Sequence, residues 1–433
     1  MKPIHALSVL LLFVPAITAK DLPVQDISIE QAVVLALENN TSVVDAQYTS
    51  DIYEAQIREY KSYAYPSVTL SAGYTRNLKK SAFFMAGQKI YTSNDNAYSG
   101  NIQLDQIVWG GGKVRAAIKM SEILSEQGQT NTEILRRQVA RSVRQICYNI
   151  MAASATVEIE SEAYTLANLH LDEMREKFDK GLVGDIEVTR QEVEVSNKVP
   201  AVIEAENLVE TGLLSLNTLL GRDPQNPINI TDTITKTLAP EPELDELYAL
   251  ALQNRTELKA SKLAIEMAKA QMKLKKGGFY PDIYAFMLSG YSASTDKLTP
   301  DSNEYNFSTS AGLNLSYPLF QSGRTVAQVK QADLAYQQSI EDDANLVRQV
   351  KSEVKQAWLD YRQALRRVNS QLKSTEQARK VVHSDNLRYL QGLASQLELN
   401  DATLALNKAQ LYYVTAMRDA FVALAQIKWA TGE

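Results

Sequence analysis

The sequence predicts a mixed α and β membrane protein in which one helix–strand–helix unit occurs twice in tandem. Three observations predict this fold class. Apolar residues recur in alternating steps of four and three over long stretches, a period of 3.5 that is typical of supercoiled helices. Four shorter stretches carry strand-like runs, most of which alternate apolar and small polar residues. The whole order recurs about 211 positions later in the chain, which indicates an internal repeat.

The first 19 residues predict a secretory signal peptide. Lys2 supplies the positive start, residues 6–14 supply a short apolar core, and Ala19 suits a cleavage site. The apolar core is too short to span a bilayer with its flanks. We therefore expect the protein to be exported across a bacterial inner membrane.

After the signal peptide, the sequence divides into a first structural repeat at 20–221, a linker at 222–242 and a second repeat at 243–433. The first repeat opens with a predicted helix over residues 29–63, for which Ser28 and Gln31 form a capping box. Both repeats then run into a Tyr-Pro pair, which ends a helix because the residue before proline is pushed toward extended geometry.

Two strands are predicted in each repeat: 66–78 and 98–109 in the first, and 281–291 and 306–320 in the second. Each run is about the 9 to 11 residues that a tilted membrane strand needs. Apolar residues alternate with small polar ones, the pattern of an outer-membrane barrel with a wet interior. The stretch 283–291 is apolar on both faces, so its outward face is left open. Polar loops at 79–97 and 292–304 join the strands of each pair.

An aromatic residue and a glycine turn follow the second strand of each pair. The first junction runs from Trp109 to Gly112, and the second runs from Phe320 to Gly323. Aromatic side chains suit a membrane interface. A phosphate-binding loop at residues 110–113 is disfavoured, because it lacks the four-residue spacing and the Ser or Thr after the lysine.

Each repeat ends in a long helical hairpin that reverses at a glycine. The first tip lies near residues 181–187 and the second near 392–398, so Gly181 of the first corresponds to Gly392 of the second. We expect both glycines mainly to form the turns. The helix that starts at Lys113 could be about 100 Å long, and such a hairpin is predicted to need lateral partners.

Four membrane strands cannot close a barrel, and open strand edges are not tolerated in lipid. The chain is therefore predicted to oligomerise. Eight strands from a dimer would be filled by side chains, whereas twelve from a trimer would leave an aqueous bore.

Other classes of protein are disfavoured. A formal net charge of -6 argues against a nucleic-acid partner. No Cys/His cluster has metal-ligand spacing and no Ser/His/Asp set is evident, so we predict no enzyme, no catalytic residue, no metal and no cofactor. The remaining alternative is a periplasmic coiled-coil scaffold without a pore, which would have no use for four strands of membrane length.

The order of elements resembles that of the TolC-like outer-membrane efflux proteins. The resemblance covers almost the whole mature chain and includes the tip sequences at 178–187 and 389–398. It implies a homotrimer with a twelve-stranded barrel in the outer membrane, continuous with a periplasmic helical tunnel. It also implies an exit duct for drugs or secreted proteins, with a periplasmic adaptor and an inner-membrane transporter as partners.

The resemblance also implies residues of a periplasmic gate. By position from Gly392, the acidic rings of the entrance fall on Glu398 and Asp401. A hydrogen bond that helps to hold the closed state falls on Tyr389 and Glu187. At Ala394 the sequence departs from the family's best-known member, which has an arginine that adds a further contact.

Overall fold

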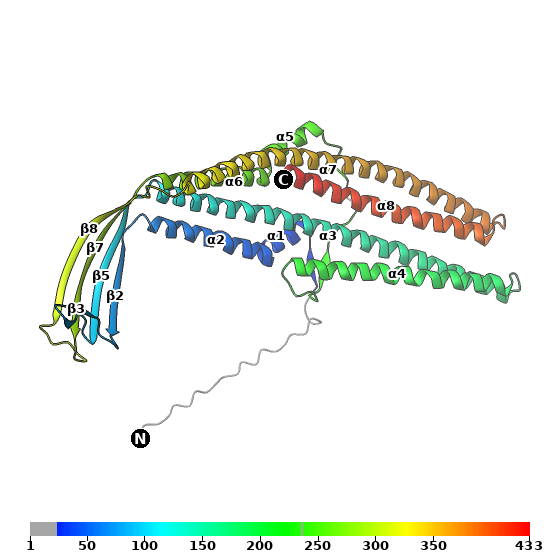
Figure 1. Ribbon diagram of the computed structural model, residues 1–433. Helices are drawn as coiled ribbons and strands as arrows, with labels where there is room; N and C mark the ends of the chain where they lie inside the picture. The colour runs from blue at the N-terminus through cyan, green and yellow to red at the C-terminus, as the bar shows by residue number, and fades with distance from the viewer. Residues whose placement is uncertain (1–23, 235–236) are drawn as a thin grey trace, which may run out of the picture. The chain divides into compact units, whose positions relative to one another are not determined.

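The computed structural model describes residues 24–234 and 237–433, so the predicted signal peptide lies outside the described residues. Figure 1 shows the elements, in this order: β1 (Gln25–Ile27), α1 (Ile29–Asn39), α2 (Thr41–Ser62), β2 (Ser67–Arg76), β3 (Ala82–Met85), β4 (Gln88–Tyr91), β5 (Asn96–Trp109), α3 (Lys113–Asp179), α4 (Asp185–Leu219), β6 (Ile228–Ile230), α5 (Leu244–Asn254), α6 (Thr256–Lys276), the 3₁₀ turn η2 (Gly277–Phe279), β7 (Asp282–Thr295), β8 (Tyr305–Ser316), α7 (Arg324–Leu390) and α8 (Gln396–Thr431).

The chain forms two compact units. The strand unit comprises Ala46–Thr132 and Thr256–Arg348, and the hairpin unit comprises the described residues up to Asp45 together with Glu133–Arg255 and Gln349–Glu433. Helices α3 and α7 contribute residues to both units. No helix within residues 24–234 and 237–433 is both long enough and apolar enough to cross a membrane.

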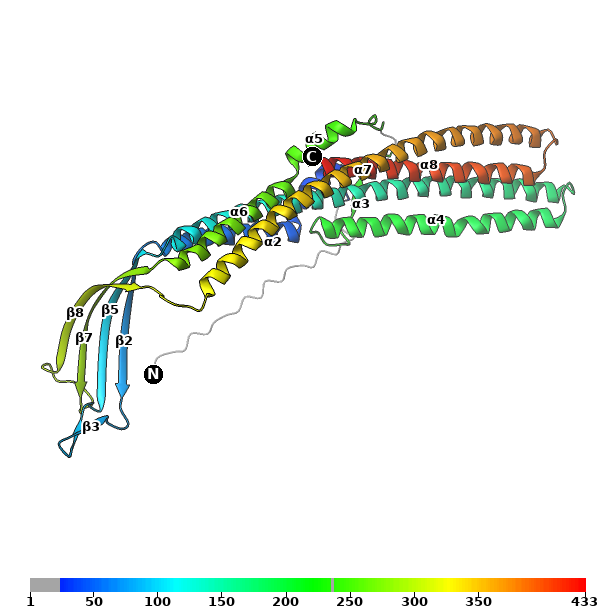
Figure 2. The same cartoon turned by 45° about the horizontal axis from the view of Figure 1, so that its top comes forward.

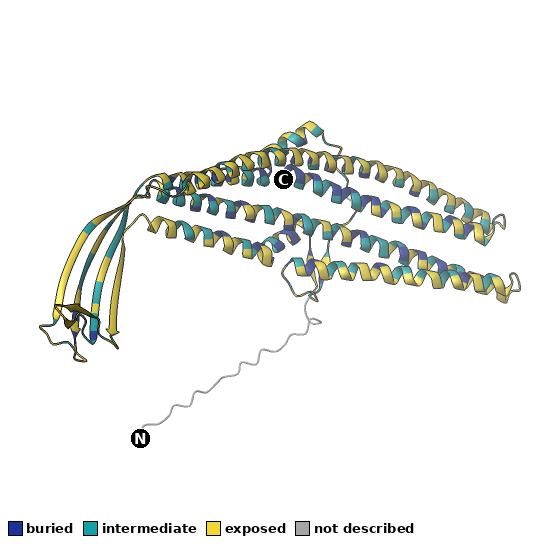
Figure 3. Ribbon diagram, in the orientation of Figure 1, coloured by how far each residue is buried: buried dark blue, intermediate teal, exposed yellow. Residues whose placement is uncertain are grey.

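The strand unit holds one antiparallel four-stranded sheet in the order β2-β5-β7-β8. Its register places the apolar residues of β2 beside those of the other strands: Val68 pairs with Leu104, Leu104 with Met287, and Met287 with Ala311. The other face carries mostly polar residues, such as Thr69 opposite Gln103. Figure 3 shows that most residues of these strands are exposed, and every residue of β2 is.

The register assigns the two faces of β7, which sequence reasoning left open. Ile283, Ala285 and Met287 share the apolar face, because they pair with Leu315, Leu313 and Ala311 of β8. Phe286 belongs to the polar face and lies over Gly312, where an added Cβ would come within 3.0 Å of the ring. The glycine thus leaves room for the aromatic ring.

The strands differ in extent from the predicted ones. Strand β8 ends at Ser316 rather than at 320, and Pro318 follows, which has no N–H to donate to a strand ladder. Strand β7 continues to Thr295. The predicted polar loop at 79–97 contains the hairpin β3–β4, whose turn residues Ala86 and Gly87 have φ of 49° and 78°. Two consecutive positive φ values are typical of a two-residue hairpin turn.

The helix predicted over residues 29–63 is divided into α1 and α2. Asn40 is extended, and its side chain accepts a hydrogen bond from the Ser42 N–H (3.0 Å) and donates one to the Leu219 carbonyl (2.8 Å). The second repeat has the same break at Arg255, which separates α5 from α6. At Asn40, a short polar residue with its own backbone contacts therefore ends the helix where hydrophobic periodicity alone would continue it.

The closing glycines of the two repeats lie against these breaks. Gly221 has φ of +68° and Gly432 has φ of +81°. A Cβ on Gly221 would lie 2.3 Å from the Asn39 carbonyl oxygen, and one on Gly432 would lie 2.8 Å from that of Asn254. At both positions glycine is therefore required, because the backbone has a positive φ and there is no room for a Cβ. The predicted linker also contains β6, which pairs in parallel with β1.

The hairpin unit is held together by the heptad positions of its helices. Helix α4 lies alongside the second half of α3, and α8 lies alongside the second half of α7, in both views (Figures 1 and 2). Val143, Val350, Val354 and Tyr361 are almost completely buried, and the Tyr361 hydroxyl donates to the Ala239 carbonyl at 2.5 Å. Cys147 is a buried free thiol, and burial raises its pKa to about 12, so it acts as a small apolar residue.

Candidate functional site

The residues predicted to form a gate lie at the two tips of the hairpin unit. Each tip turns at a glycine, with φ of +72° at Gly181 and +73° at Gly392. The Leu182 N–H donates to the Lys177 carbonyl (2.9 Å), and the Leu393 N–H donates to the Arg388 carbonyl (2.8 Å). These backbone bonds, five residues apart, close a helix end around a left-handed glycine. The two tips thus have the same turn geometry.

Glu398 forms part of a capping box at the start of α8. Its carboxylate accepts hydrogen bonds from the Ser395 N–H (2.7 Å) and the Ser395 hydroxyl (3.1 Å), while the Ser395 Oγ accepts from the Glu398 N–H. The backbone hydrogen bond from Ser395, followed by that from its hydroxyl, lowers the pKa of Glu398 below its usual value of 4.5. Glu398 is therefore an ionised residue held in a fixed position, a role that the spacing Ser-x-x-Glu could have indicated.

Asp401 lies three residues after Glu398 and is exposed. Residues three apart lie on one face of a helix. The structure therefore brings the two predicted carboxylates to the same side of the first turns of α8.

Tyr389 contacts a different residue from the predicted one. Its hydroxyl accepts a hydrogen bond from the Lys177 Nζ at 2.6 Å, and the ammonium lies 4.5 Å from the centroid of the tyrosine ring. The Glu187 carboxylate instead lies back over Gly184, where an added Cβ would be 3.0 Å from its Oε2. Within the part of the chain that the structure describes, Tyr389 and Glu187 are not hydrogen-bonded to each other. The contact between the hairpins therefore joins α3 to α7.

Two further polar contacts join the hairpins, and sequence reasoning missed both. The buried Gln191 donates to the Ala167 carbonyl (3.2 Å) and accepts from the Asn400 side chain (3.3 Å). Farther from the tips, Asn407 donates to the buried carboxylate of Glu160 at 3.2 Å. The one sequence signal was Glu160 itself, which interrupts the heptad pattern of α3.

The predicted junctions lie in the strand unit. Trp109 packs edge-on against Tyr280, with ring centroids 5.7 Å apart. Gly112 and Gly323 have φ of +82° and +79°, as a turn from strand to helix requires. The Phe320 side chain is 86% exposed. Both predicted aromatic residues thus lie at the ends of strands or just beyond them.

The described residues were also compared with the requirements of a metal site. Among residues 24–234 and 237–433, no group of three or more His, Cys, Asp or Glu is placed to hold a metal ion. The arrangement at the tips can repel like charges, attract cations and hold two hairpins together by hydrogen bonds.

Comparison with known proteins agrees with this architecture. The chain is 22% identical over 390 residues to the outer membrane protein TolC of Escherichia coli, which covers 87% of this chain and 76% of that protein. Its fold matches the outer membrane protein VceC of Vibrio cholerae with a TM-score of 0.78 and 18% identity, covering 93% of this chain and 96% of that one. It also matches the CmeC outer membrane channel of Campylobacter jejuni with a TM-score of 0.80 and 19% identity, covering 93% and 85%.

The family model described as outer membrane efflux protein matches the chain in two segments, residues 32–222 and 247–433. These segments follow the two structural repeats and leave the 222–242 linker largely outside. Since they cover most of the sequence, the chain belongs to the outer membrane efflux protein family.

Proposed function

We propose that three copies of this chain form the outer-membrane exit duct of a tripartite efflux or type I secretion system. Members of this family are outer-membrane channels rather than enzymes. The observation that carries the trimer is the four-stranded sheet, whose edge strands β2 and β8 have no further partner strand among the described residues. In lipid each unpaired backbone group costs several kcal/mol, so neighbouring copies must pair with both edges.

Twelve strands fit the chemistry of the sheet better than eight. The polar face carries small hydroxyl and amide side chains, including Thr69, Asn101, Gln103 and Ser310. Such residues suit the wall of an aqueous bore, which twelve strands leave open and eight do not. The apolar face then meets the lipid.

The helical hairpins extend the duct into the periplasm in this proposal. Helices α3 and α7 have 67 residues each, and a helix of this length is about 100 Å long. Their tips would meet an inner-membrane transporter, and a periplasmic adaptor would hold the assembly. The duct conducts small molecules or proteins that the transporter delivers.

The tips act as the gate. Three copies of Glu398 and Asp401 would form two stacked acidic rings at the narrow entrance. Rings of carboxylates attract cations, as in cation channels. Tyr389 helps to hold the closed state; the family resemblance pairs it with Glu187, and its contact with Lys177 in the structure offers a second route to the same effect.

Single-channel recording in planar bilayers tests the acidic rings. Glu398→Gln with Asp401→Asn removes the charges while the amide of residue 398 can still cap α8. We expect the permeability ratio of cations to anions to fall toward one, and block by multivalent cations to be lost. Glu204→Ala with Glu206→Ala removes two exposed carboxylates of α4 and should leave selectivity unchanged.

The same recordings discriminate between a duct and a scaffold. If the Glu398 and Asp401 variant kept its selectivity and its block, the filter would lie elsewhere in the duct. If the wild-type protein formed no channel and stayed outside the outer-membrane fraction, the periplasmic scaffold would be the better account.

A further inference from the structure

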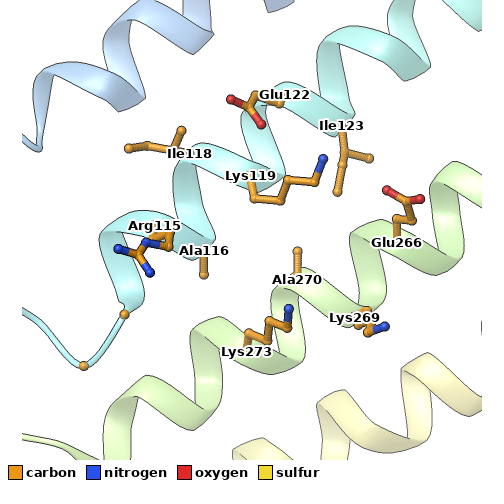
Figure 4. Close-up of a pocket in the computed structure, with 12 residues that line it drawn as sticks. Arg115, Ala116, Ile118, Lys119, Glu122, Ile123, Glu266, Lys269, Ala270 and Lys273 are labelled. Atoms are coloured by element: carbon orange, nitrogen blue, oxygen red, sulfur yellow. The ribbon is translucent and has the colours of Figure 1, made fainter.

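A basic groove lies between α3 and α6 in the strand unit, just after the junction glycines. Its volume is about 720 Å³, and Gly111 and Gly112 lie at one end. Four cationic side chains line it: Arg115 and Lys119 from α3, and Lys269 and Lys273 from α6. Figure 4 shows that the two pairs come from opposite walls of the groove, with Glu122 and Glu266 farther along the same helices. Among the residues that line the groove, the charges nearest the glycines are positive.

None of these four cations has an ion pair or hydrogen bond to another side chain within residues 24–234 and 237–433. Neighbouring cations do: Lys113 is paired with Asp282 at 2.7 Å, and Lys259 with Glu126 at 3.2 Å. The groove lining thus has more cations than carboxylates, which are Glu122 and Glu266.

The position of Arg115 on its helix makes this charge costly. The first turn of α3 contains no acidic residue, and the start of a helix already carries a partial positive charge from the macrodipole. A cation in the first turn is therefore repelled by the macrodipole and destabilises the helix. Lys273 is different, because it lies in the last turn of α6, where the macrodipole favours a cation. Arg115 therefore needs another explanation, and a bound anion supplies one.

The α3 cations of the groove lie on a different side of their helix from Lys113. Lys113 reaches Asp282, which pairs with Ser316 and belongs to the polar face. Arg115 and Lys119 follow Lys113 by about 200° and 240° around the helix, so they point to the opposite side. Trp109, at the end of β5, pairs with Ile283 on the apolar face of the sheet.

The equivalent positions of the internal repeat reproduce half of this set of charges. Lys119 corresponds to Lys330, 211 residues later, and Lys273 corresponds to Arg58, 215 residues earlier. Arg115 and Lys269 correspond instead to Val326 and Glu54. Cations at these last two positions are therefore not a requirement of the repeated architecture.

We propose that this groove binds the phosphate headgroup of an anionic phospholipid in the membrane leaflet next to the periplasm. The inference rests on the proposed function, because the sheet must lie in the outer membrane. The acyl chains would remain against the apolar face of the sheet, beside Trp109, and the headgroup would reach past the aromatic residue into the groove. A guanidinium can bind a phosphate through two parallel hydrogen bonds, and lysines add point charges.

Native mass spectrometry of the detergent-solubilised trimer tests this inference. Phosphatidylglycerol and phosphatidylethanolamine are added separately at equal concentrations. We expect preferential binding of phosphatidylglycerol, up to one per groove. Replacing all four cations with glutamine should weaken that binding by about fivefold for each charge removed, since a cation near an anionic surface contributes ~1 kcal/mol.

A matched variant controls for net charge. The control variant replaces four exposed lysines of α7 with glutamine: Lys351, Lys355, Lys373 and Lys380. These substitutions should leave phosphatidylglycerol binding unchanged. Equal weakening in both variants would overturn the inference, since net charge alone would then explain it. Inorganic phosphate that displaces the lipid at equal concentration would identify a free-phosphate site and overturn it too.

The experiment distinguishes failure of the lipid site from failure of the proposed duct. A wild-type trimer that conducts in planar bilayers but binds both lipids equally would overturn the lipid site and leave the duct standing. A wild-type protein that forms no trimer would overturn the duct itself. The groove could instead retain an acidic periplasmic protein. If the variant with all four cations replaced lost that protein but bound the lipid unchanged, the lipid assignment would be overturned in favour of a protein partner.

Discussion

At the scale of single residues, the tips show how a predicted position can have an unpredicted partner. Tyr389 meets Lys177 of α3 rather than Glu187 of α4. Both candidates lie near Gly181 in the sequence, and only the packing of the two hairpins decides between them. Glu398 likewise caps its own helix in addition to any role in a ring.

The Lys177 contact leads to a prediction about gating. Lys177→Ala should raise single-channel conductance, because it removes a charge-assisted hydrogen bond worth about 1.5–3 kcal/mol at most. Tyr389→Phe should also raise single-channel conductance. Recordings of Glu187→Ala provide the comparison: a rise in Glu187→Ala and Tyr389→Phe but not in Lys177→Ala would show that the resemblance names the true partner.

Arg255 leads to a prediction about stability. Its side chain is 4% exposed, donates to Glu353 at 2.9 Å and stacks over Trp429 with 4.5 Å to the ring centroid. Arg255→Ala should lower stability by about 2–3 kcal/mol, through loss of the stacking and of a charged hydrogen bond. Thermal unfolding followed by circular dichroism measures this. Arg366→Ala, at an exposed position of α7, should shift the midpoint little, and equal shifts would refute the assignment.

At the scale of elements, close helix packing depends on small residues. Gly212 of α4 faces Ile150 of α3, and an added Cβ would lie 2.6 Å from the Ile150 Cγ1. In the same way, Gly128 of α3 faces Tyr53 of α2, with 2.7 Å to the ring. Both glycines lie inside long helices, where glycine is unfavourable by itself, so close approach is the reason for their presence.

Gly212→Ala tests this packing. Helix propensity alone would stabilise the variant by about 1 kcal/mol, whereas overpacking costs about 1–3 kcal/mol. We expect a lower thermal midpoint for the variant. The neighbouring exposed substitution Thr211→Ala gains propensity without the clash and should not lower the midpoint. A Gly212→Ala protein more stable than the wild type would mean that α3 and α4 are not packed so closely.

The sequence was informative about elements wherever one period dominated. The alternation in β2, β5 and β8 predicted strands because each has one apolar and one polar face. The faces of β7 could not be predicted, since both are apolar, and only pairing with β8 distinguishes them. The β3–β4 hairpin was missed because its loop was judged by polarity rather than by its Ala86-Gly87 turn.

Contacts between the hairpins were beyond sequence reasoning for a different reason. Glu160 and Asn407 are 247 residues apart, and their meeting depends on the exact alignment of α3 with α8. Periodicity predicts which face of a helix is buried but not its axial position against a distant helix. The break at Asn40 was missed because its side chain bonds Ser42 and also Leu219, which is 179 residues away. Arg255 likewise donates to Glu353 and Ala430, which are 98 and 175 residues away.

At the scale of the whole molecule, the proposed duct needs more than one chain. The sheet has an apolar face, a polar face and two edges without partner strands among the described residues. Only a closed barrel satisfies the backbone in lipid. The sheet, the basic groove beside α3 and the tips all depend on this closure for their proposed roles.

The mass of the detergent-solubilised protein tests the central claim most directly. Light scattering or native mass spectrometry should give three chains per particle, since three sheets of four strands close a barrel with an open bore. The same particles should conduct ions in planar bilayers. A stable particle of one or two chains that still forms a closed, conducting barrel would contradict the account.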